Sequence, residues 1–223
     1  MSIKKLAKAL SFKRNKGMTM KSDTKKTLNI VTVGDGDTGK TCLLMSFKGE
    51  RFPTKYIPTV FETYTHDLHI EGVDIEVGLW DTAGQEGYDR LRPLAYPKCD
   101  CFVICYAIDN PDSLSNVREK WLPELERYSP HVPRILVATK KDIRRRTLAI
   151  MDFLNGNKAH KIVSYEEGLC MAASIGATRF IETSALLNDG VREAFEETSR
   201  VALEAKKRKK EKGLKRIKGR FVM

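Results

Sequence analysis

One octapeptide combines the residue types that can hold a polyphosphate. Residues 34–41 read GDGDTGKT, which has the form G-x-x-x-x-G-K-[ST]. Glycines let such a loop wrap a phosphate with its N–H groups pointing inward. Lys40 can then neutralise the β- and γ-phosphates, while the Thr41 hydroxyl can ligate Mg²⁺. The residues that we expect around the phosphates are Gly34, Asp35, Gly36, Asp37, Thr38, Gly39, Lys40, Thr41 and Cys42.

A second segment, residues 81–85 (DTAGQ), has groups that could act on the terminal phosphate. An aspartate at the end of a strand beside the phosphate loop can hold the magnesium shell through water, which is the role we expect for Asp81. The N–H of Gly84 can bind the γ-phosphate, and the side-chain amide of Gln85 can orient an attacking water. The alternative is an ordinary polar turn after a strand.

Two further segments predict a site for the base. A carboxylate at Asp142 can accept hydrogen bonds from N1–H and the exocyclic amine of guanine, whereas adenine would leave that charge unpaired. The stem of Lys140 could pack on the base, and the N–H of Ala185 could donate to O6 of guanine. The alternative is a solvated basic turn, which the nearby run of three arginines favours. The residues that we expect around the base are Thr139, Lys140, Asp142, Ser184, Ala185 and Leu186.

The segments between these motifs predict the elements that must position them. Apolar, β-branched runs precede each motif, and helical patterns follow several of them. We expect strands at residues 28–33, 65–70, 73–80, 101–108, 134–138 and 178–181, and helices at 41–47, 112–128, 164–175 and 189–209. The hairpin turns near Gly72, and Ser164 with Glu167 predicts a capping box. We therefore predict an α/β fold with a doubly wound, mostly parallel six-stranded sheet and one antiparallel edge hairpin. The ligand should lie at the carboxyl ends of its strands.

Taken together, these motifs resemble the small GTPases of the Ras superfamily, and specifically the Rho/Rac branch. The likeness covers residues 28–204 and is dense at 56–61 (YIPTVF) and 80–97 (WDTAGQEGYDRLRPLAYP). Residues 143–163 lie where Rho proteins carry an insert helix, although their sequence differs from the usual charged one.

The resemblance implies further site residues. Thr59 matches the threonine that ligates Mg²⁺ through its hydroxyl and reaches the γ-phosphate through its N–H. Phe52 matches an aromatic residue that flanks the guanine, and Tyr56 one that closes over the phosphates, although composition alone favours ordinary packing for both. Loops 52–64 and 81–92 match the two switches. The catalytic set is then Gln85, Lys40, Thr59 and Gly84, and the metal set is Thr41 and Thr59 with Asp81 through water.

The expected function is a monomeric GTP hydrolase that binds GTP or GDP with Mg²⁺ and switches effector binding. Exchange factors, GTPase-activating proteins and effectors are the implied partners, and actin regulation is implied by family likeness alone. One departure supports an alternative. Residues 37–38 read Asp-Thr where Rho proteins usually have Ala-Val. A carboxylate about 6 Å from the phosphates adds roughly 3 kcal/mol of bare repulsion at an effective dielectric of about 20. The alternative is a scaffold that exchanges nucleotide quickly and hydrolyses little.

Charge divides the chain into a body and two basic ends. The whole chain of 223 residues carries a formal charge of +11, yet residues 1–30 and residues 204–223 carry +8 each. Residues 31–203 therefore carry −5. We expect a basic N-terminal extension at 1–27, a GTPase domain at 28–204 and a polybasic tail at 205–223.

Both ends have the pattern of basic amphipathic helices. Apolar residues recur at helical spacing among lysines and arginines, namely Ile3, Leu6, Ala7 and Leu10 at one end, and Leu214, Ile217 and Phe221 at the other. Arg220 stands where a C-terminal prenylation cysteine would be. We expect a cytoplasmic protein that lies peripherally on the acidic inner membrane face without a prenyl anchor. Solvated disordered tails, or a nuclear role for residues 206–210 (KKRKK), are the alternatives, and nucleic acid binding is the less expected one.

Overall fold

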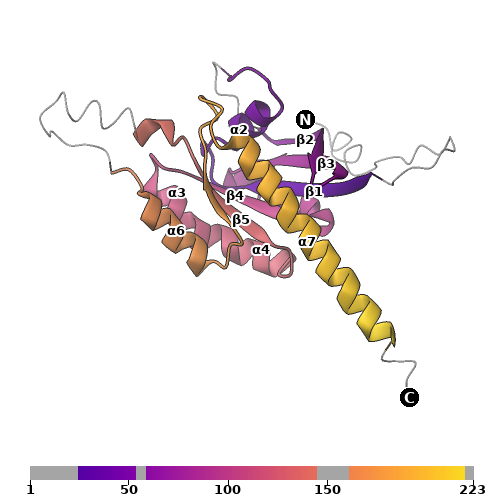
Figure 1. The fold of residues 1–223 in the computed structure, drawn as a ribbon. Helices are drawn as coiled ribbons and strands as arrows, with labels where there is room; N and C mark the ends of the chain where they lie inside the picture. The colour runs from indigo at the N-terminus through magenta and orange to yellow at the C-terminus, as the bar shows by residue number, and fades with distance from the viewer. Residues whose placement is uncertain (1–24, 54–58, 145–160, 219–223) are drawn as a thin grey trace, which may run out of the picture.

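A six-stranded sheet forms the centre of the structure. The computed structural model describes residues 25–53, 59–144 and 161–218, with only the backbone described for 213–218. The strand order is β2-β3-β1-β4-β5-β6 (Figure 1). The strands are β1 (Lys26–Val33), β2 (Phe61–Ile70), β3 (Val73–Thr82), β4 (Cys101–Ala107), β5 (Arg134–Thr139) and β6 (Phe180–Glu182). Every neighbouring pair is parallel except β2 and β3, which confirms the predicted fold class.

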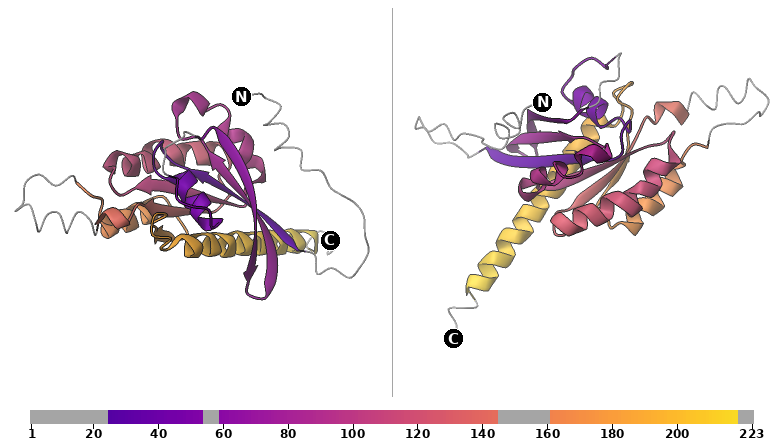
Figure 2. Two further views of the ribbon diagram at one scale, coloured as in Figure 1. Left: turned by 90° about the horizontal axis from the view of Figure 1, so that it is seen from above. Right: turned by 180° about the vertical axis from the view of Figure 1, so that it is seen from behind.

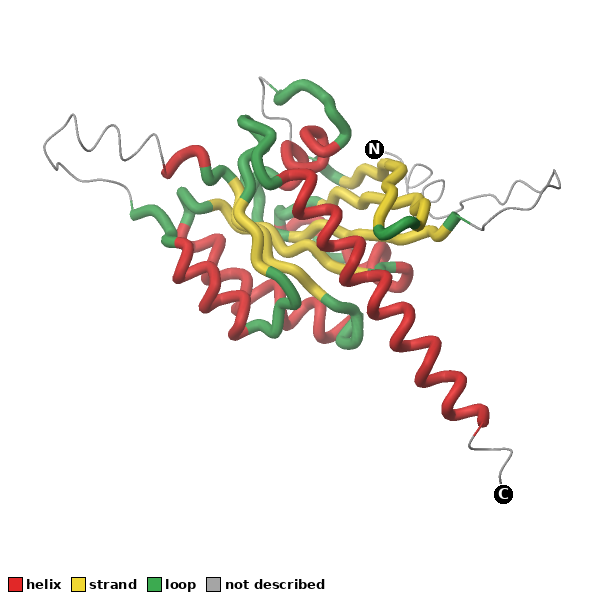
Figure 3. Tube along the Cα trace, in the orientation of Figure 1, coloured by secondary structure: helices red, strands yellow, loops and turns green. Residues whose placement is uncertain are grey.

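Helices cover both faces of the sheet, as the red and yellow segments of Figure 3 show. They are α2 (Lys40–Phe47), η1 (Glu86–Tyr88), η2 (Arg92–Lys98), α3 (Pro111–Asn116), η3 (Val117–Trp121), α4 (Leu122–Tyr128), α6 (Tyr165–Ser174) and α7 (Val191–Lys218). One core cluster joins α2 and α7 to the sheet through side chains such as Phe47 and Phe195. The other core cluster joins η3 and α6 to the opposite face of the sheet, through side chains such as Trp121 and Ala172. Because both faces are covered, all seven residues of β4 are buried, as expected of a central parallel strand.

The edge hairpin turns at Glu71 and Gly72, as the sequence predicts. The last paired residues are Ile70 and Val73, so the loop has two residues. Both have positive φ, 51° at Glu71 and 75° at Gly72, which is the left-handed conformation that a tight hairpin turn of this kind requires. Glycine adopts it freely, whereas Glu71 does so at a cost.

Several element boundaries differ from those predicted. β2 begins at Phe61 and β3 continues through Thr82, so both extend into segments assigned to the switch loops. The register pairs Phe61 with Thr82, because the backbone groups of the two strands satisfy each other along this whole length. β6 starts at Phe180 rather than at residue 178.

The predicted helix at 112–128 is interrupted. A π-helical turn, η3, separates α3 from α4 and carries the buried Trp121. The helix at 164–175 is observed as α6, and the predicted capping box is confirmed. The N–H of Glu167 donates to Oγ of Ser164 at 3.1 Å, and the N–H of Ser164 donates to a carboxylate oxygen of Glu167 at 2.8 Å.

The last helix is longer than predicted. α7 continues to Lys218 instead of ending near residue 209, because ten of the fourteen residues from 205 to 218 are helix-favouring lysine, arginine or glutamate, which outweigh the single glycine at 213. Its first half packs on the sheet, and its second half projects from the body (Figures 1 and 2). None of the described helices has the length and apolar composition needed to cross a bilayer.

Some predictions fall outside the described residues. These are the amphipathic pattern at residues 3–10, the part of the first switch loop at 54–58 that includes Tyr56, most of the insert at 143–163, and Arg220 and Phe221. The side chains of Leu214 and Ile217 are likewise not described.

Candidate nucleotide-binding site

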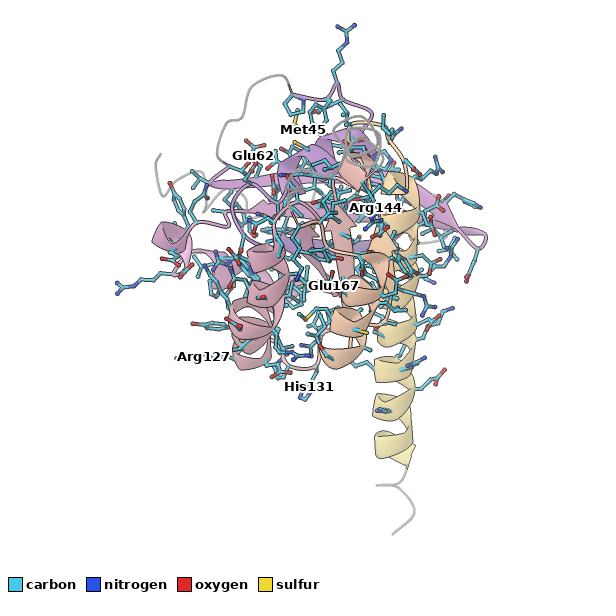
Figure 4. The ribbon with its side chains drawn as sticks, turned by 90° about the vertical axis from the view of Figure 1, so that its left-hand side faces the viewer. Met45, Glu62, Arg127, His131, Arg144 and Glu167 are labelled. Carbon is cyan, nitrogen blue, oxygen red and sulfur yellow. The ribbon has the colours of Figure 1, made fainter. Side chains whose placement is uncertain are left out.

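Two adjoining cavities lie at the carboxyl ends of the parallel strands, where the fold predicts a ligand. One has a volume of about 470 Å³ and the other about 370 Å³, and they share lining residues Asp37, Gly39, Cys42 and Pro53. Figure 4 shows Met45 and Glu62, which line the larger cavity, at the opposite end of the body from Arg127 and His131. The position and size suit a nucleotide whose phosphates and base occupy neighbouring spaces.

The phosphate loop is closed around the side chain of Lys40. The Lys40 ammonium donates to the carbonyl oxygens of Gly34 at 2.8 Å and Asp35 at 2.7 Å. Burial lowers the pKa of Lys40, although the charge of Asp81 opposes that shift. A polyanion placed in the cavity would supply a stronger partner for this buried cation.

The carboxylate of Asp35 faces away from the cavity. It accepts hydrogen bonds from Nδ2 of Asn116 at 2.6 Å and from Nε1 of Trp121 at 2.8 Å. Thr38 likewise uses its hydroxyl internally, donating to the carbonyl oxygen of Asp35 at 2.8 Å. The side chains of both residues therefore hold the loop in shape.

Three oxygen-bearing side chains from three segments meet beside the loop. The Thr41 hydroxyl donates to Oδ2 of Asp81 at 2.6 Å, so the Thr59 hydroxyl must donate to Thr41 across their 2.7 Å contact. Among the described residues, Oδ1 of Asp81 is buried with no hydrogen-bond partner. Two hydroxyls and a buried carboxylate with an unpartnered oxygen are hard ligands, and they fit Mg²⁺. Burial raises the pKa of Asp81 to about 6, and a bound cation would oppose that shift.

Gly84 packs directly against the phosphate loop. A Cβ at this position would lie 2.3 Å from backbone atoms of Asp35 and Gly36, so only glycine fits. The side chain of Gln85 lies close by, with Nε2 3.8 Å from the position that a Cβ on Gly36 would take. The segment after β3 is thus held where its amides can face a terminal phosphate.

The segments predicted to bind the base come together at the smaller cavity. The Ser184 hydroxyl donates to Oδ1 of Asp142 at 2.7 Å, and Asp142 itself is buried. Thr139 links this region to the phosphate loop, because its hydroxyl lies 2.6 Å from the carbonyl oxygen of Thr38. The cavity is also lined by Cys42, Phe52, Lys140, Ala185 and Leu186. Phe52 and Leu186 are 43% and 48% exposed, which leaves apolar surface available to a planar base.

Asp37 points into solvent instead of toward the phosphate loop's interior. Its side chain is 80% exposed and lies 3.5 Å from the ammonium of Lys140. The same ammonium is 3.2 Å from a carboxylate oxygen of Asp109. The outward direction and the nearby cation both reduce the repulsion that the sequence alone suggests.

Sequence reasoning did not identify the residues behind the site. Asn116 and Trp121 hold Asp35, and Arg92 donates to the carbonyl oxygen of Ala83 at 2.7 Å. Their partners are distant in the sequence, so the only available signal is the presence of a tryptophan and an asparagine on a helix beside the sheet.

The site thus combines a closed phosphate loop, a hydroxyl and carboxylate cluster, and a carboxylate in a base-sized cavity. A sequence model of the Ras family matches residues 29–204, which is most of the chain. The protein therefore belongs to the Ras family.

Proposed function

We propose that this protein is a Rho-type GTP hydrolase that works as a molecular switch. The contact among Thr41, Thr59 and Asp81 carries the proposal, because it joins the phosphate loop, the first switch and the end of β3. Membership of the Ras family makes the protein a small GTPase that binds guanine nucleotide. The Rho branch is supported by the sequence of residues 80–97.

In the proposed complex, the protein recognises the two ends of the nucleotide separately. Lys40 neutralises phosphate charge from within the loop, and Asp142 accepts from the guanine edge while Ser184 holds its other oxygen. Thr41 and Thr59 would hold Mg²⁺ directly, with Asp81 behind them. Mg²⁺ bound there supplies positive charge against the β- and γ-phosphates.

Hydrolysis and switching use the same contacts. The N–H groups of Thr59 and Gly84 hold the γ-phosphate, and this orders loops 52–64 and 81–92 for effectors. The amide of Gln85 orients the attacking water. Loss of the γ-phosphate removes both N–H contacts and releases the two segments. As in Ras, unassisted turnover is on the order of 10⁻⁴ to 10⁻³ s⁻¹, and an activating protein raises it about 10⁵-fold.

Calorimetry on ligand-stripped, folded protein tests nucleotide recognition. With Mg²⁺ present, GDP should bind and ADP should give no measurable heat. Equal binding of the two nucleotides, or no heat with GDP, contradicts the proposal.

The second candidate function, a scaffold that cycles by exchange alone, rests on the repulsion between Asp37 and the phosphates, which its 80% exposure and its contact with Lys140 weaken. Single-turnover phosphate release from GTP-loaded protein separates the two. Measurable release supports the hydrolase, whereas exchange without release supports the scaffold.

We further propose that the protein works as a monomer with exchange factors, GTPase-activating proteins and effectors, and that its basic helix end binds acidic membrane. The exposed residues of α7 include six cations and one acid between 206 and 212. Each cation near an anionic leaflet contributes about 1 kcal/mol, and salt screens it.

Sedimentation with phosphatidylserine vesicles tests membrane binding through α7. Lys→Gln changes at 207, 209 and 210 should reduce pelleting, and Lys→Arg changes at the same positions should preserve it. Equal pelleting of all three proteins contradicts membrane binding through α7.

A further inference from the structure

A buried arginine lies behind the second switch. The side chain of Arg92, at the start of η2, is 0% exposed. Its Nε and Nη2 donate to the two carboxylate oxygens of Glu124 on α4, at 2.9 and 2.8 Å. Nη2 also donates to Asp89 at 2.7 Å. A buried charge is tolerated only with such pairing, and the fork of Glu124 supplies it.

The remaining arm of Arg92 reaches the segment that faces the γ-phosphate. Its Nη1 donates to the carbonyl oxygen of Ala83 at 2.7 Å. The next residue, Gly84, abuts the phosphate loop so closely that no side chain would fit there. Fixing the carbonyl of Ala83 therefore fixes the peptide that presents the N–H of Gly84 and precedes Gln85.

Trp121 connects this arginine to the phosphate loop. The guanidinium of Arg92 lies 4.5 Å from the centre of the Trp121 ring, within the range of a cation–π contact. On its other edge, Nε1 of Trp121 donates to Oδ1 of Asp35 at 2.8 Å. Trp121 is fully buried and belongs to the π-helical turn η3, a distortion that is frequent at functional sites. The indole of Trp121 thus contacts Arg92, which binds the carbonyl of Ala83, and also Asp35, which belongs to the phosphate loop.

We propose that Arg92 is a positioning residue for GTP hydrolysis, and that Trp121 gives the phosphate loop and the Ala83–Gln85 segment one shared support. The inference rests on the proposed hydrolase function. Arg92 acts through the carbonyl of Ala83 and does not touch the nucleotide. Its loss misplaces Gly84 and Gln85 relative to the phosphates, whereas the base cavity and Lys40 keep their own contacts.

The test measures single-turnover phosphate release from GTP-loaded protein, together with the Kd for GDP and the melting temperature. Arg92→Lys keeps the charge, but its single nitrogen with three N–H donors cannot reproduce the four hydrogen bonds that Arg92 makes from three nitrogens to Glu124, Asp89 and Ala83. We expect release to slow by about 10- to 100-fold while the Kd for GDP changes less than about threefold. Trp121→Phe keeps a ring beneath the guanidinium and loses the bond to Asp35, so we expect a smaller slowing, about fivefold.

Arg144→Lys is the matched control. Arg144 also pairs with both oxygens of a carboxylate, on Glu182, and donates to a backbone carbonyl, that of Val163. Its variant should lower the melting temperature while phosphate release stays at the wild-type rate. Wild-type release rates in folded Arg92→Lys or Trp121→Phe would overturn the inference, as would equal slowing in Arg144→Lys.

Comparing the wild type with Arg92→Lys separates a failure of this inference from a failure of the proposed hydrolase function. Protein that binds GDP but releases no phosphate from GTP overturns the hydrolase proposal together with the role of Arg92, whereas phosphate release that is equally fast in the wild type and in Arg92→Lys overturns the role of Arg92 alone. Protein that binds no guanine nucleotide overturns both.

Discussion

The Thr41 hydroxyl donates a 2.6 Å hydrogen bond to Oδ2 of Asp81, across 40 positions of sequence. The bond joins the first residue after the phosphate-binding lysine to the end of a neighbouring strand. Burial raises the pKa of Asp81 from 3.8 to about 6, against the opposing effect of the Thr41 hydrogen bond. A proton and a divalent cation therefore compete for one carboxylate.

This competition predicts opposite pH dependences with and without metal. In the nucleotide-free protein, the stability that protonated Asp81 contributes is fully present below pH 3.8 and is lost as the pH rises through about 6. Mg²⁺ needs the ionised carboxylate, so the Mg²⁺-dependent affinity for GDP should fall as the pH falls through that same value, by at most about tenfold per pH unit. Urea unfolding and GDP binding measured from pH 4.5 to 7.5 check both slopes.

Asp81→Asn is the control, since an amide does not titrate. Subtracting its profiles from those of the wild type should isolate both slopes. Wild-type profiles with the same pH dependence in Mg²⁺ and in chelator would contradict the competition.

Asp142→Asn should change which purine is bound. The side-chain amide of the variant replaces one acceptor oxygen with an NH₂ donor. GDP therefore loses a charge-assisted hydrogen bond, and the exocyclic amine of its guanine faces another donor. We expect its Kd to rise at least about 100-fold, or about 2.7 kcal/mol. Xanthosine diphosphate, which has a carbonyl in place of that amine, should bind the variant better than GDP does. Ser184→Ala removes only the supporting hydroxyl and should cost about tenfold without changing the preferred base. An unchanged preference for guanine in Asp142→Asn would contradict this assignment.

Asp37→Ala should slow the release of GDP. The carboxylate is exposed and lies 3.5 Å from Lys140, so solvent and that cation leave only part of the bare repulsion. We expect roughly a threefold to tenfold slower release, measured with a fluorescent GDP analogue, and a smaller difference at 0.5 M salt because screening weakens it. Release from the variant that equals or exceeds the wild-type rate means that Asp37 does not act on the nucleotide.

Glu71→Asn should stabilise the edge hairpin. Glu71 has φ 51° in a two-residue turn before Gly72, and asparagine tolerates that conformation better than glutamate does. The expected gain is about 0.5–1 kcal/mol in the free energy of unfolding, measured with urea. Glu76→Asn, on the same hairpin but in a strand with ordinary φ, is the control and should not stabilise. A neutral or destabilising result at Glu71 would show that its contact with Arg200, at 3.8 Å, outweighs the backbone strain.

The parts of the site that the sequence predicts are those whose chemistry is written in contiguous residues. The phosphate loop is one, because strand, glycine loop and helix follow one another within residues 28–47. Asp142 and Ser184 are predictable one at a time from their motifs, and the sheet topology then explains why they meet. The fold class follows from the alternation of strands and helices.

The remainder depends on contacts between distant residues. The carboxylate of Asp35 turns away from the cavity because Asn116 and Trp121 bind it, and these residues follow it by 81 and 86 positions in the sequence. The burial of Arg92 depends on Glu124 and Trp121, and nothing around residue 92 distinguishes this arginine from exposed ones. The extra length of β2 follows from pairing with β3, which overrode the loop expected from the switch motif. Periodicity cannot reveal any of these.

α7 has a mechanical consequence. Its 28 residues make a rod of roughly 42 Å at about 1.5 Å per residue, rooted on the sheet beside α2 and free of the body at its far end. A partner bound to the free end of α7 would therefore hold the nucleotide cavity at a fixed distance and in a limited range of orientations. A flexible linker with the same number of residues would let the domain rotate freely relative to that partner. The rigid helix instead limits which face of the domain is accessible to another protein.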